Sequence, residues 1–258
     1  ASTLDVLRTG FGQLTDVDPA RSPLWRERSV RRRMEVLRAP FIDVRDAARR
    51  LGGTLNTALL TAASEAAGEY HRAKGQPIDE LRASMAISTR RTDPGGGASA
   101  NAFSLARMLV PTTEMKIVDR FGEIRRITEE AAGTSAGALN AVATLASNLP
   151  TAILTRVARL QSQTVDFATS NVKGTPLPVF VAGSEILHNF PIGPLGGVAF
   201  NLTLLSHVGS LDMGLNIDPA SIDDPDLLRD CLQSAFADLA SATPAKKSKG
   251  SGRRAADR

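Results

Sequence analysis

Two adjacent polar side chains, Ser170 and Asn171, stand in the run TSNVKG between two extended apolar segments. A hydroxyl and an amide at the end of a strand can hydrogen-bond to the backbone of the following turn. The same groups can donate a hydrogen bond to a carbonyl oxygen that gains negative charge during a reaction. We expect the turn-stabilising role for both residues, with donation near a reacting carbonyl as the functional alternative.

The three histidines are the side chains best suited to accept a proton near neutral pH. His71 is expected to end a helix and face water, His188 to lie at a strand edge, and His207 to lie in an alternating strand. None has a neighbouring acid at a spacing that indicates a catalytic pair. The G-x-S-x-G pattern occurs once, as GTSAG at 133–137, but it lies between two predicted helices and not after a strand, so it does not predict a nucleophile elbow. The sequence has no glycine-rich phosphate loop and no metal-ligand spacing. The residues therefore predict neither a self-sufficient catalytic set nor a metal site.

Composition narrows the classes of function. The single cysteine, Cys231, excludes an internal disulfide framework and is predicted to be a buried, inert thiol. No apolar run is long enough to span a bilayer, so we expect a cytoplasmic location. Aromatic residues make up 4% of the chain, which argues against a stacking surface for single-stranded nucleic acid. We expect no nucleic-acid partner.

Positive charge is concentrated in two places. The last thirteen residues, KKSKGSGRRAADR, carry a net charge of +5, whereas the whole chain carries +4, so residues 1–245 sum to about −1. Residues 242–258 are predicted to form a disordered basic tail. A second basic cluster, RSPLWRERSVRRRMEVLR, alternates with Met34 and Val36, which predicts that its arginines occupy the wet face of an edge strand.

Periodicity predicts an α+β domain with a mixed sheet and packed helices. Residues 1–30 are expected to connect to a preceding domain, and 31–241 to form the domain itself. Expected helices are 41–53 with Asp43 as N-cap, 55–73, a long segment after 114, then 139–150 and 151–163, and 225–240. Expected strands are 32–40, 82–90, 103–111, 164–172, 177–183, 184–190, 197–209 and 210–218.

Three segments, in order, resemble the bacterial wax ester synthase/diacylglycerol acyltransferase family. GGTLNTALLTAASEAAGEYHRAKGQPIDELRASMAISTR is similar to the stretch with an N-D-V-x-L-A helix followed by a V-P-V-S-x-R strand. DFATSNVKGTPLPVFVAG resembles F-x-x-S-N-V-P-G-P-x-x-P-L-Y-x-A-G. FPIGPLGGVAFNLTLLSHVGSLDMGLNIDPASIDDPDLL resembles the family's ending from P-x-G-P-L-x-G to D-P-D. The similarity runs from about Ser22 to Leu239.

The resemblance covers the C-terminal half of that family. It implies the second domain of a chloramphenicol-acetyltransferase-like pair, with a tunnel between the two domains. The family transfers a fatty acyl group from acyl-CoA to diacylglycerol or a long-chain alcohol, giving triacylglycerol or wax ester. Acyl-CoA is then a co-substrate, with no bound cofactor, and contact with a membrane or lipid bodies would be peripheral.

The resemblance also implies where the base lies. The family's HHxxxDG motif carries the general base, and no His-His pair exists in this sequence. We expect an N-terminal half bearing that motif as a partner, and no activity from this chain alone. The alternative is an inactive orphan domain of the same fold that binds a lipid or another acyltransferase half. A lipid slot would be walled by the alanine-rich face of helix 55–73 and by the apolar faces of strands 164–217.

Motif residues carried over by the resemblance are expected to line the tunnel or support it, with the structural role favoured. They are Asn56, Thr57, Ser170, Asn171, Gly174, Asn201 and His207. Three signature positions differ from the family: Thr57 replaces Asp, Lys173 replaces Pro, and His207 replaces Tyr. Lys173 could meet a phosphate of CoA, although an exposed turn lysine is the simpler reading. The departures are those expected of a divergent member.

Overall fold

A six-stranded mixed sheet forms the centre of the protein in a computed structural model that describes residues 20–88, 103–146 and 164–244. Its strand order is β1-β8-β7-β4-β2-β3. β4 runs parallel to both β7 and β2, and the remaining neighbours are antiparallel. The strands are β1 (Arg33–Pro40), β2 (Glu80–Ser88), β3 (Phe103–Pro111), β4 (Phe167–Val172), β7 (Phe200–His207) and β8 (Ser210–Ile217). The predicted mixed sheet of an α+β fold is confirmed.

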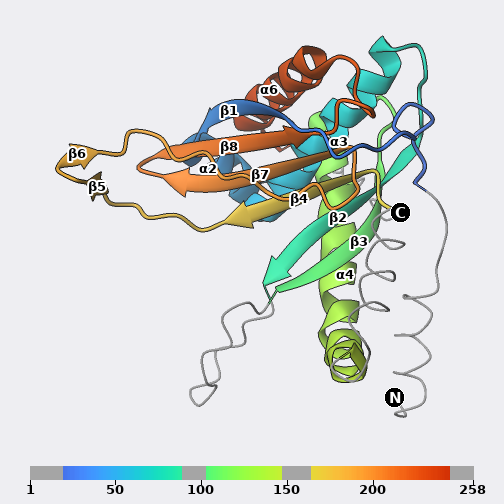
Figure 1. Cartoon of the computed structure of the whole chain (residues 1–258), viewed down its shortest axis with the longest axis horizontal. Coiled ribbons are helices and arrows are strands. Elements are labelled where there is room, and N and C mark those ends of the chain that lie inside the picture. Colours follow the sequence, from blue (N-terminus) through green and yellow to red (C-terminus); the bar gives the residue numbers. More distant parts are fainter. Residues whose placement is uncertain (1–19, 89–102, 147–163, 245–258) are drawn as a thin grey trace, which may run out of the picture.

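Helices cover one face of this sheet (Figure 1). They are α2 (Phe41–Arg50), α3 (Leu55–Ala73), α4 (Ile117–Ala146) and α6 (Pro225–Ser241). α3 packs against α6, α4, α2 and β4, and α4 also packs against β3. Strand side chains alternate, so Phe167, Leu202 and Leu215 lie in the core beneath the helices whereas their chain neighbours face outward. The small alanine side chains of α3 allow this close helix packing.

Helix starts follow local capping chemistry. Thr54 accepts a hydrogen bond from the Thr57 backbone N–H, and the Thr57 side chain reciprocates toward the Thr54 N–H, which forms a capping box at α3. Asp224 accepts from the Leu227 N–H at 3.1 Å and precedes Pro225 at the first position of α6. Predicted capping of α2 by Asp43 is wrong: that helix starts at Phe41, because Pro40 ends β1 and turns the chain directly into it.

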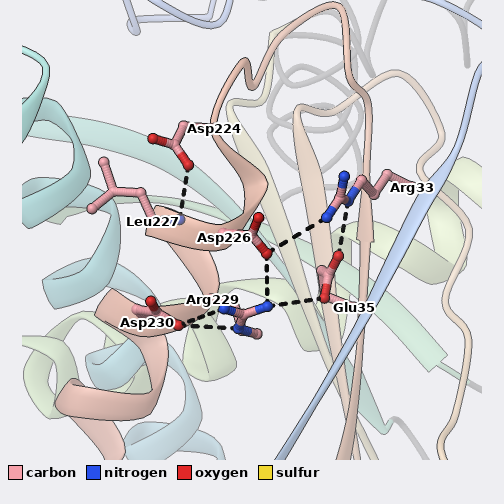
Figure 2. Close-up of polar contacts among 7 residues, drawn as sticks. All are labelled: Arg33, Glu35, Asp224, Asp226, Leu227, Arg229 and Asp230. Carbon is pink, nitrogen blue, oxygen red and sulfur yellow. Dashed lines mark hydrogen bonds and ion pairs between the residues drawn. The ribbon is translucent and has the colours of Figure 1, made fainter.

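Ion pairs connect β1 to the first turns of α6 (Figure 2). Arg229 contacts Glu35 at 3.4 Å, Asp226 at 2.7 Å and Asp230 at 2.9 Å. Arg33 approaches Glu35 at 2.8 Å and Asp226 at 3.5 Å. These groups are solvent-accessible, so each pair contributes little, on the order of 0–1 kcal/mol. This network engages the side chains of Glu35 and Arg33 on the helix side of β1.

Residues 20–32 lead into β1 and are held firmly on the core. Trp25 is fully buried, with its ring 4.4 Å from that of His71 and 5.6 Å from that of Phe200. The carboxylate of Asp166 accepts hydrogen bonds from Ser22 N at 2.8 Å and Arg21 N at 3.2 Å. Most of the expected connecting segment, residues 1–19, lies outside the described residues, but its last part forms a built-in piece of the domain.

A narrow hairpin, here called the arm (residues 177–187), leaves the sheet after β4. It contains β5 (Phe180–Val181) and β6 (Ser184–Glu185), joined by Ala182 and Gly183 with φ of 50° and 84°. In Figure 1 the arm projects past the ends of β7 and β8. The sequence predicted longer strands over 177–183 and 184–190. They are shorter because β5 and β6 pair only with each other and not with the main sheet.

One other helical prediction is wrong. Residues 117–146 form one helix that runs through Gly133 and Gly137, whereas a second helix was predicted to begin at 139. Each glycine costs about 1 kcal/mol in a helix interior, and packing of α4 can outweigh that cost. The predicted helix at 151–163 and the basic tail beyond Pro244 fall outside the described residues. Within the described parts of the chain, the helices are too short or too polar to cross a bilayer.

Candidate functional site

The carboxyl ends of the parallel strands β2, β4 and β7 meet at one edge of the sheet. Such edges are where open α/β sheets hold their ligands. Asn171 lies there, near the end of β4, and the N-terminus of α3 reaches the same place. The Asn171 Nδ2 donates a hydrogen bond to Oδ1 of Asn56 at 2.7 Å, across 115 positions of sequence. Two residues singled out from separate motifs are therefore in direct contact.

This amide pair leaves one donor set free. The Nδ2 group of Asn56 makes no hydrogen bond within the described residues and is only partly buried. Asn56 lies in the first turn of α3, where the helix dipole favours negative charge. Asn171 fixes the Asn56 carbonyl oxygen and so orients the N–H groups away from it. The arrangement can hydrogen-bond an anionic or carbonyl oxygen at this edge.

Thr57 and Ser170 are placed differently from their motif partners. Thr57 is buried and completes the capping box of α3, so its hydroxyl is occupied by Thr54. Ser170 is next to Asn171 in a strand, and successive side chains of a strand point to opposite faces. Asn171 points toward α3, which directs Ser170 to the outer face, level with Thr203 of β7. The Ser–Asn pair does not converge on one point.

The turn after β4 requires a glycine at position 174, because two backbone segments come very close together there. A Cβ at this position would lie 1.9 Å from the backbone oxygen of Ser206, and the Gly174 N–H donates to the Ser206 Oγ at 3.3 Å. The chain leaving β4 is thus pressed against the end of β7. Lys173, just before it, is exposed, and it forms no ion pair within the described ranges. Its ammonium is free to contact a ligand at this edge.

Asn201 holds a segment called here the strap (residues 188–199), which returns from the arm across the outer face of β7 and β8, and His207 holds the root of the arm. Asn201 Nδ2 donates to the Pro194 carbonyl at 2.8 Å, and Asn216 Nδ2 donates to that of Gly193 at 2.9 Å. The buried His207 ring places Nε2 2.9 Å from the Ile186 carbonyl, at the root of the arm. Both motif residues position backbone rather than face a substrate.

The three histidines do not converge at this edge of the sheet. His71 was predicted to face water, yet it is fully buried, because α3 presents it to Ser22 and Trp25. Its Nε2 lies 2.8 Å from Ser22 Oγ and its Nδ1 2.7 Å from the Ala67 carbonyl. Burial lowers the pKa of His71, although the Ala67 contact and Asp166 oppose that effect. His188 lies in the strap, not in a strand, and is exposed.

No metal-binding cluster of His, Cys, Asp and Glu occurs among the described residues. Among the same residues, neither His188 nor His207 forms a hydrogen bond or ion pair with a carboxylate. The site residues that the structure brings together are Asn56 and Asn171 with Gly174 and Lys173 close by in the chain. Thr57 supports that edge by capping α3, and His207 lies at the same end of β7, whereas Asn201 lies at the opposite end of that strand.

The alanine-rich face of α3 is not the wall of a lipid slot. Ala58, Ala62, Ala63 and Ala66 are fully buried against protein, and so are Phe167 and Leu202 on the strands. These residues are core because the helices and the sheet fill each other's grooves. Sequence reasoning instead missed the exposed apolar side chains of the arm: Leu177 (68% exposed), Phe180 (61%), Val181 (60%) and Leu187 (70%). Apolar residues on a hairpin this short were the available signal.

Known proteins are similar to this chain in sequence and in fold. The WS/DGAT C-terminal domain profile matches residues 99–240, which is more than half of the sequence. This chain belongs to that family. A Mycobacterium tuberculosis protein named as a candidate diacylglycerol O-acyltransferase is 32% identical over 219 residues, covering 84% of this chain and 44% of its own length. A second M. tuberculosis relative, Tgs4, is 26% identical, with 78% and 43% covered. The WS/DGAT domain thus spans less than half the length of these relatives.

Solved structures agree on the fold of this WS/DGAT domain. The wax ester synthase/diacylglycerol acyltransferase of Marinobacter aquaeolei superposes with a TM-score of 0.64 at 18% identity, covering 92% of this chain and 55% of that one. The EpoB cyclization-docking bidomain of Sorangium cellulosum gives 0.59 at 16% identity, covering 94% and 49%. Both therefore contain this fold as about half of a larger chain. The chloramphenicol-acetyltransferase-like fold inferred from the motifs is confirmed.

Proposed function

We propose that this WS/DGAT domain forms one side of the active site of an acyl-CoA-dependent O-acyltransferase. The reaction would join a fatty acyl group to diacylglycerol or a long-chain alcohol, giving triacylglycerol or wax ester. The observation that carries the proposal is the Asn171–Asn56 amide pair, which presents donors at the edge where the parallel strands end. Its position suits stabilisation of the thioester oxygen as it gains charge.

The proposal assigns proton abstraction to another polypeptide segment. An N-terminal half carrying HHxxxDG would supply the base within about 3 Å of the acceptor hydroxyl. The arm supports this assignment, because its exposed apolar side chains are a surface that a second half could cover. Lys173 would contact a phosphate of CoA at the same edge. Association with a membrane or lipid body would be peripheral.

Reconstitution tests the proposal. An N-terminal half bearing HHxxxDG is mixed with this chain, and CoA release from palmitoyl-CoA is followed with diacylglycerol or hexadecanol as acceptor. We expect a rate above the sum of the separate halves. Asn56→Ala should lower that rate by about a hundredfold, the typical cost of one oxyanion donor. Asn189→Ala is the matched control, since this exposed strap residue bonds only through its backbone N–H.

The competing function is a lipid- or partner-binding domain without catalysis. The substitutions at Thr57, Lys173 and His207 favour it, since all three alter signature positions. Stable association of the two halves without any gain in CoA release would support this second function. Lys173→Ala adds a separate readout: it should raise the KM for palmitoyl-CoA several-fold and leave kcat near its original value, provided that the lysine binds phosphate.

A further inference from the structure

Exposed apolar side chains lie on the outer face of the edge strand β1, opposite the helices, and on two segments outside the strand. Val30 is 91% exposed, Met34 39% and Val36 50%, and Ile192 of the strap is 68% exposed. These four residues are called here the β1 outer surface. Leu37 and Ala39, which alternate with Val36, are buried beneath the helices. β1 therefore carries apolar side chains on both faces, and only those on the helix side belong to the core.

Ile192 belongs to this surface because of the sheet register. Met34 pairs with Asn216 and Val36 with Gly214 on the neighbouring strand β8. The strap crosses β8 at those two positions: Asn216 bonds to the Gly193 carbonyl, and a Cβ at Gly214 would lie 1.8 Å from the Pro191 oxygen. Ile192 is therefore held next to Met34 and Val36. Met34 and Val36 lie about 7 Å apart along the strand at 3.3 Å per residue, and Val30 lies in a bend just before the strand.

Unpaired arginines border the same surface. Arg26, Arg31 and Arg32 are exposed and form no ion pair within the part of the chain that the structure describes. The acid closest along the strand, Glu35, points to the helix side, where Arg33 and Arg229 engage it (Figure 2). Arg38 pairs with the buried Asp212. Glu27 is the one exposed acid among residues 26–33, so the local charge stays positive.

We propose that the β1 outer surface and its arginines dock this domain onto an anionic phospholipid membrane. The apolar side chains would enter the headgroup region, and the arginines would contact lipid phosphates. Charge complementarity selects this occupant, since a neutral protein surface would leave three arginines without counter-ions. The inference specifies the membrane contact within the proposed function. Its test measures binding alone, so it can fail while acyl transfer is confirmed.

Vesicle co-sedimentation of the full chain provides the test. Vesicles of phosphatidylcholine alone are compared with vesicles containing about one third phosphatidylglycerol. We expect binding to the anionic vesicles that weakens as salt rises. Each basic residue near an anionic surface changes affinity roughly fivefold, so Arg31→Glu with Arg32→Glu should reduce binding at least tenfold. Met34→Thr with Val36→Thr should reduce binding while its salt dependence remains.

Two controls separate local from global charge. Lys116→Glu with Arg126→Glu makes the same change in net charge within α4 and just before it, and α4 packs at the β3 end of the sheet. Charge reversal of Lys246, Lys247 and Lys249 tests the basic tail. Both controls should bind like the original chain, and circular dichroism should show every variant folded. The proposal is overturned if the original chain ignores anionic vesicles, or if either control reduces binding as much as Arg31→Glu with Arg32→Glu. It is also overturned if the β1 variants bind anionic vesicles like the original chain and lose only binding to a protein partner.

Discussion

Two fully buried charged side chains, Asp166 and Arg120, form hydrogen bonds with backbone groups. Asp166 is fully buried, and its carboxylate accepts N–H groups from Arg21, Ser22 and Arg82. Arg120 is fully buried as well and bonds Glu65, Ser64 and the carbonyls of Pro111 and Thr113. Burial lowers the pKa of Arg120, but Glu65 opposes the effect. Such groups knit segments that are distant in sequence, which is a structural role.

His71 predicts a pH dependence of stability. Burial holds its pKa below the ordinary 6.5 in the folded state. The unfolded chain therefore takes up the proton first as pH falls, so stability is full above pH 6.5 and declines below it. The free energy of unfolding should therefore be lower at pH 5.5 than at pH 7.5. Urea unfolding at a series of pH values measures it.

His71→Gln is the control for that experiment. Glutamine can accept the Ser22 hydroxyl hydrogen but cannot titrate. The lowered pKa of Asp218 and Asp223 acts near and below pH 3.8, outside this window. Parallel loss of stability in the original chain and in His71→Gln would assign the effect to other groups.

Cys231 predicts an unreactive thiol. Burial in α6 raises its pKa to about 11. At pH 8 only about 0.1% of the thiol is then ionised, and the thiolate is the reactive form. Reaction with a disulfide reagent should be at least a hundredfold slower in the native protein than in urea. Equal rates in the two conditions would contradict the burial of this side chain.

At the scale of elements, the β7–β8 turn stores backbone strain. Val208 and Gly209 have φ of 39° and 81°, the left-handed pair of a two-residue hairpin turn. Valine is a poor residue there, because its branched side chain crowds the backbone at positive φ. Val208→Asn should stabilise the protein by about 1 kcal/mol, measured as a rise in Tm of a few degrees. A fall in Tm would mean that the half-exposed valine contributes packing instead.

Close strap packing gives a second prediction for elements. A Cβ at Gly214 would meet the Pro191 oxygen, which is backbone and cannot rotate away. Gly214→Ala should cost about 2–3 kcal/mol, as overpacking commonly does. Gly122→Ala in α4 is the matched control: nothing lies within 4 Å of its Cβ, so alanine should stabilise that helix by about 0.5–1 kcal/mol. Chemical denaturation of both variants gives the comparison.

Periodicity predicted most elements because each buries one regular face. The alternation of 103–111 and the spacing of 55–73 match β3 and α3 in their bounds. The arm was predicted as longer strands, since local apolar content does not reveal that its two strands pair only with each other. His71 was misplaced because its burial depends on Trp25, which comes from another segment. The Asn56–Asn171 contact could not be predicted from spacing, as tertiary folding alone joins residues so far apart.

At the scale of the whole molecule, the arm distinguishes a half-domain from a self-contained one. Its four apolar side chains are 60–70% exposed, whereas the apolar side chains of the core are buried. A free arm should bind a hydrophobic dye such as ANS, and an N-terminal half bearing HHxxxDG should displace that dye. Phe180→Ser with Val181→Ser should lower dye binding and weaken association of the halves at least tenfold. Because both side chains are exposed, Tm should change by less than about 2 °C.

The control for the arm must be apolar, exposed and elsewhere. Ile42→Ser at the start of α2 meets this need, since Ile42 is 55% exposed and outside the arm. It should leave association of the halves unchanged. If Ile42→Ser and the arm variant weaken association equally, the second half does not recognise the arm in particular. If neither does, and the original chain binds no dye, then the arm folds back onto the domain in solution. In that case the base must reach Asn56 without a partner covering this hairpin.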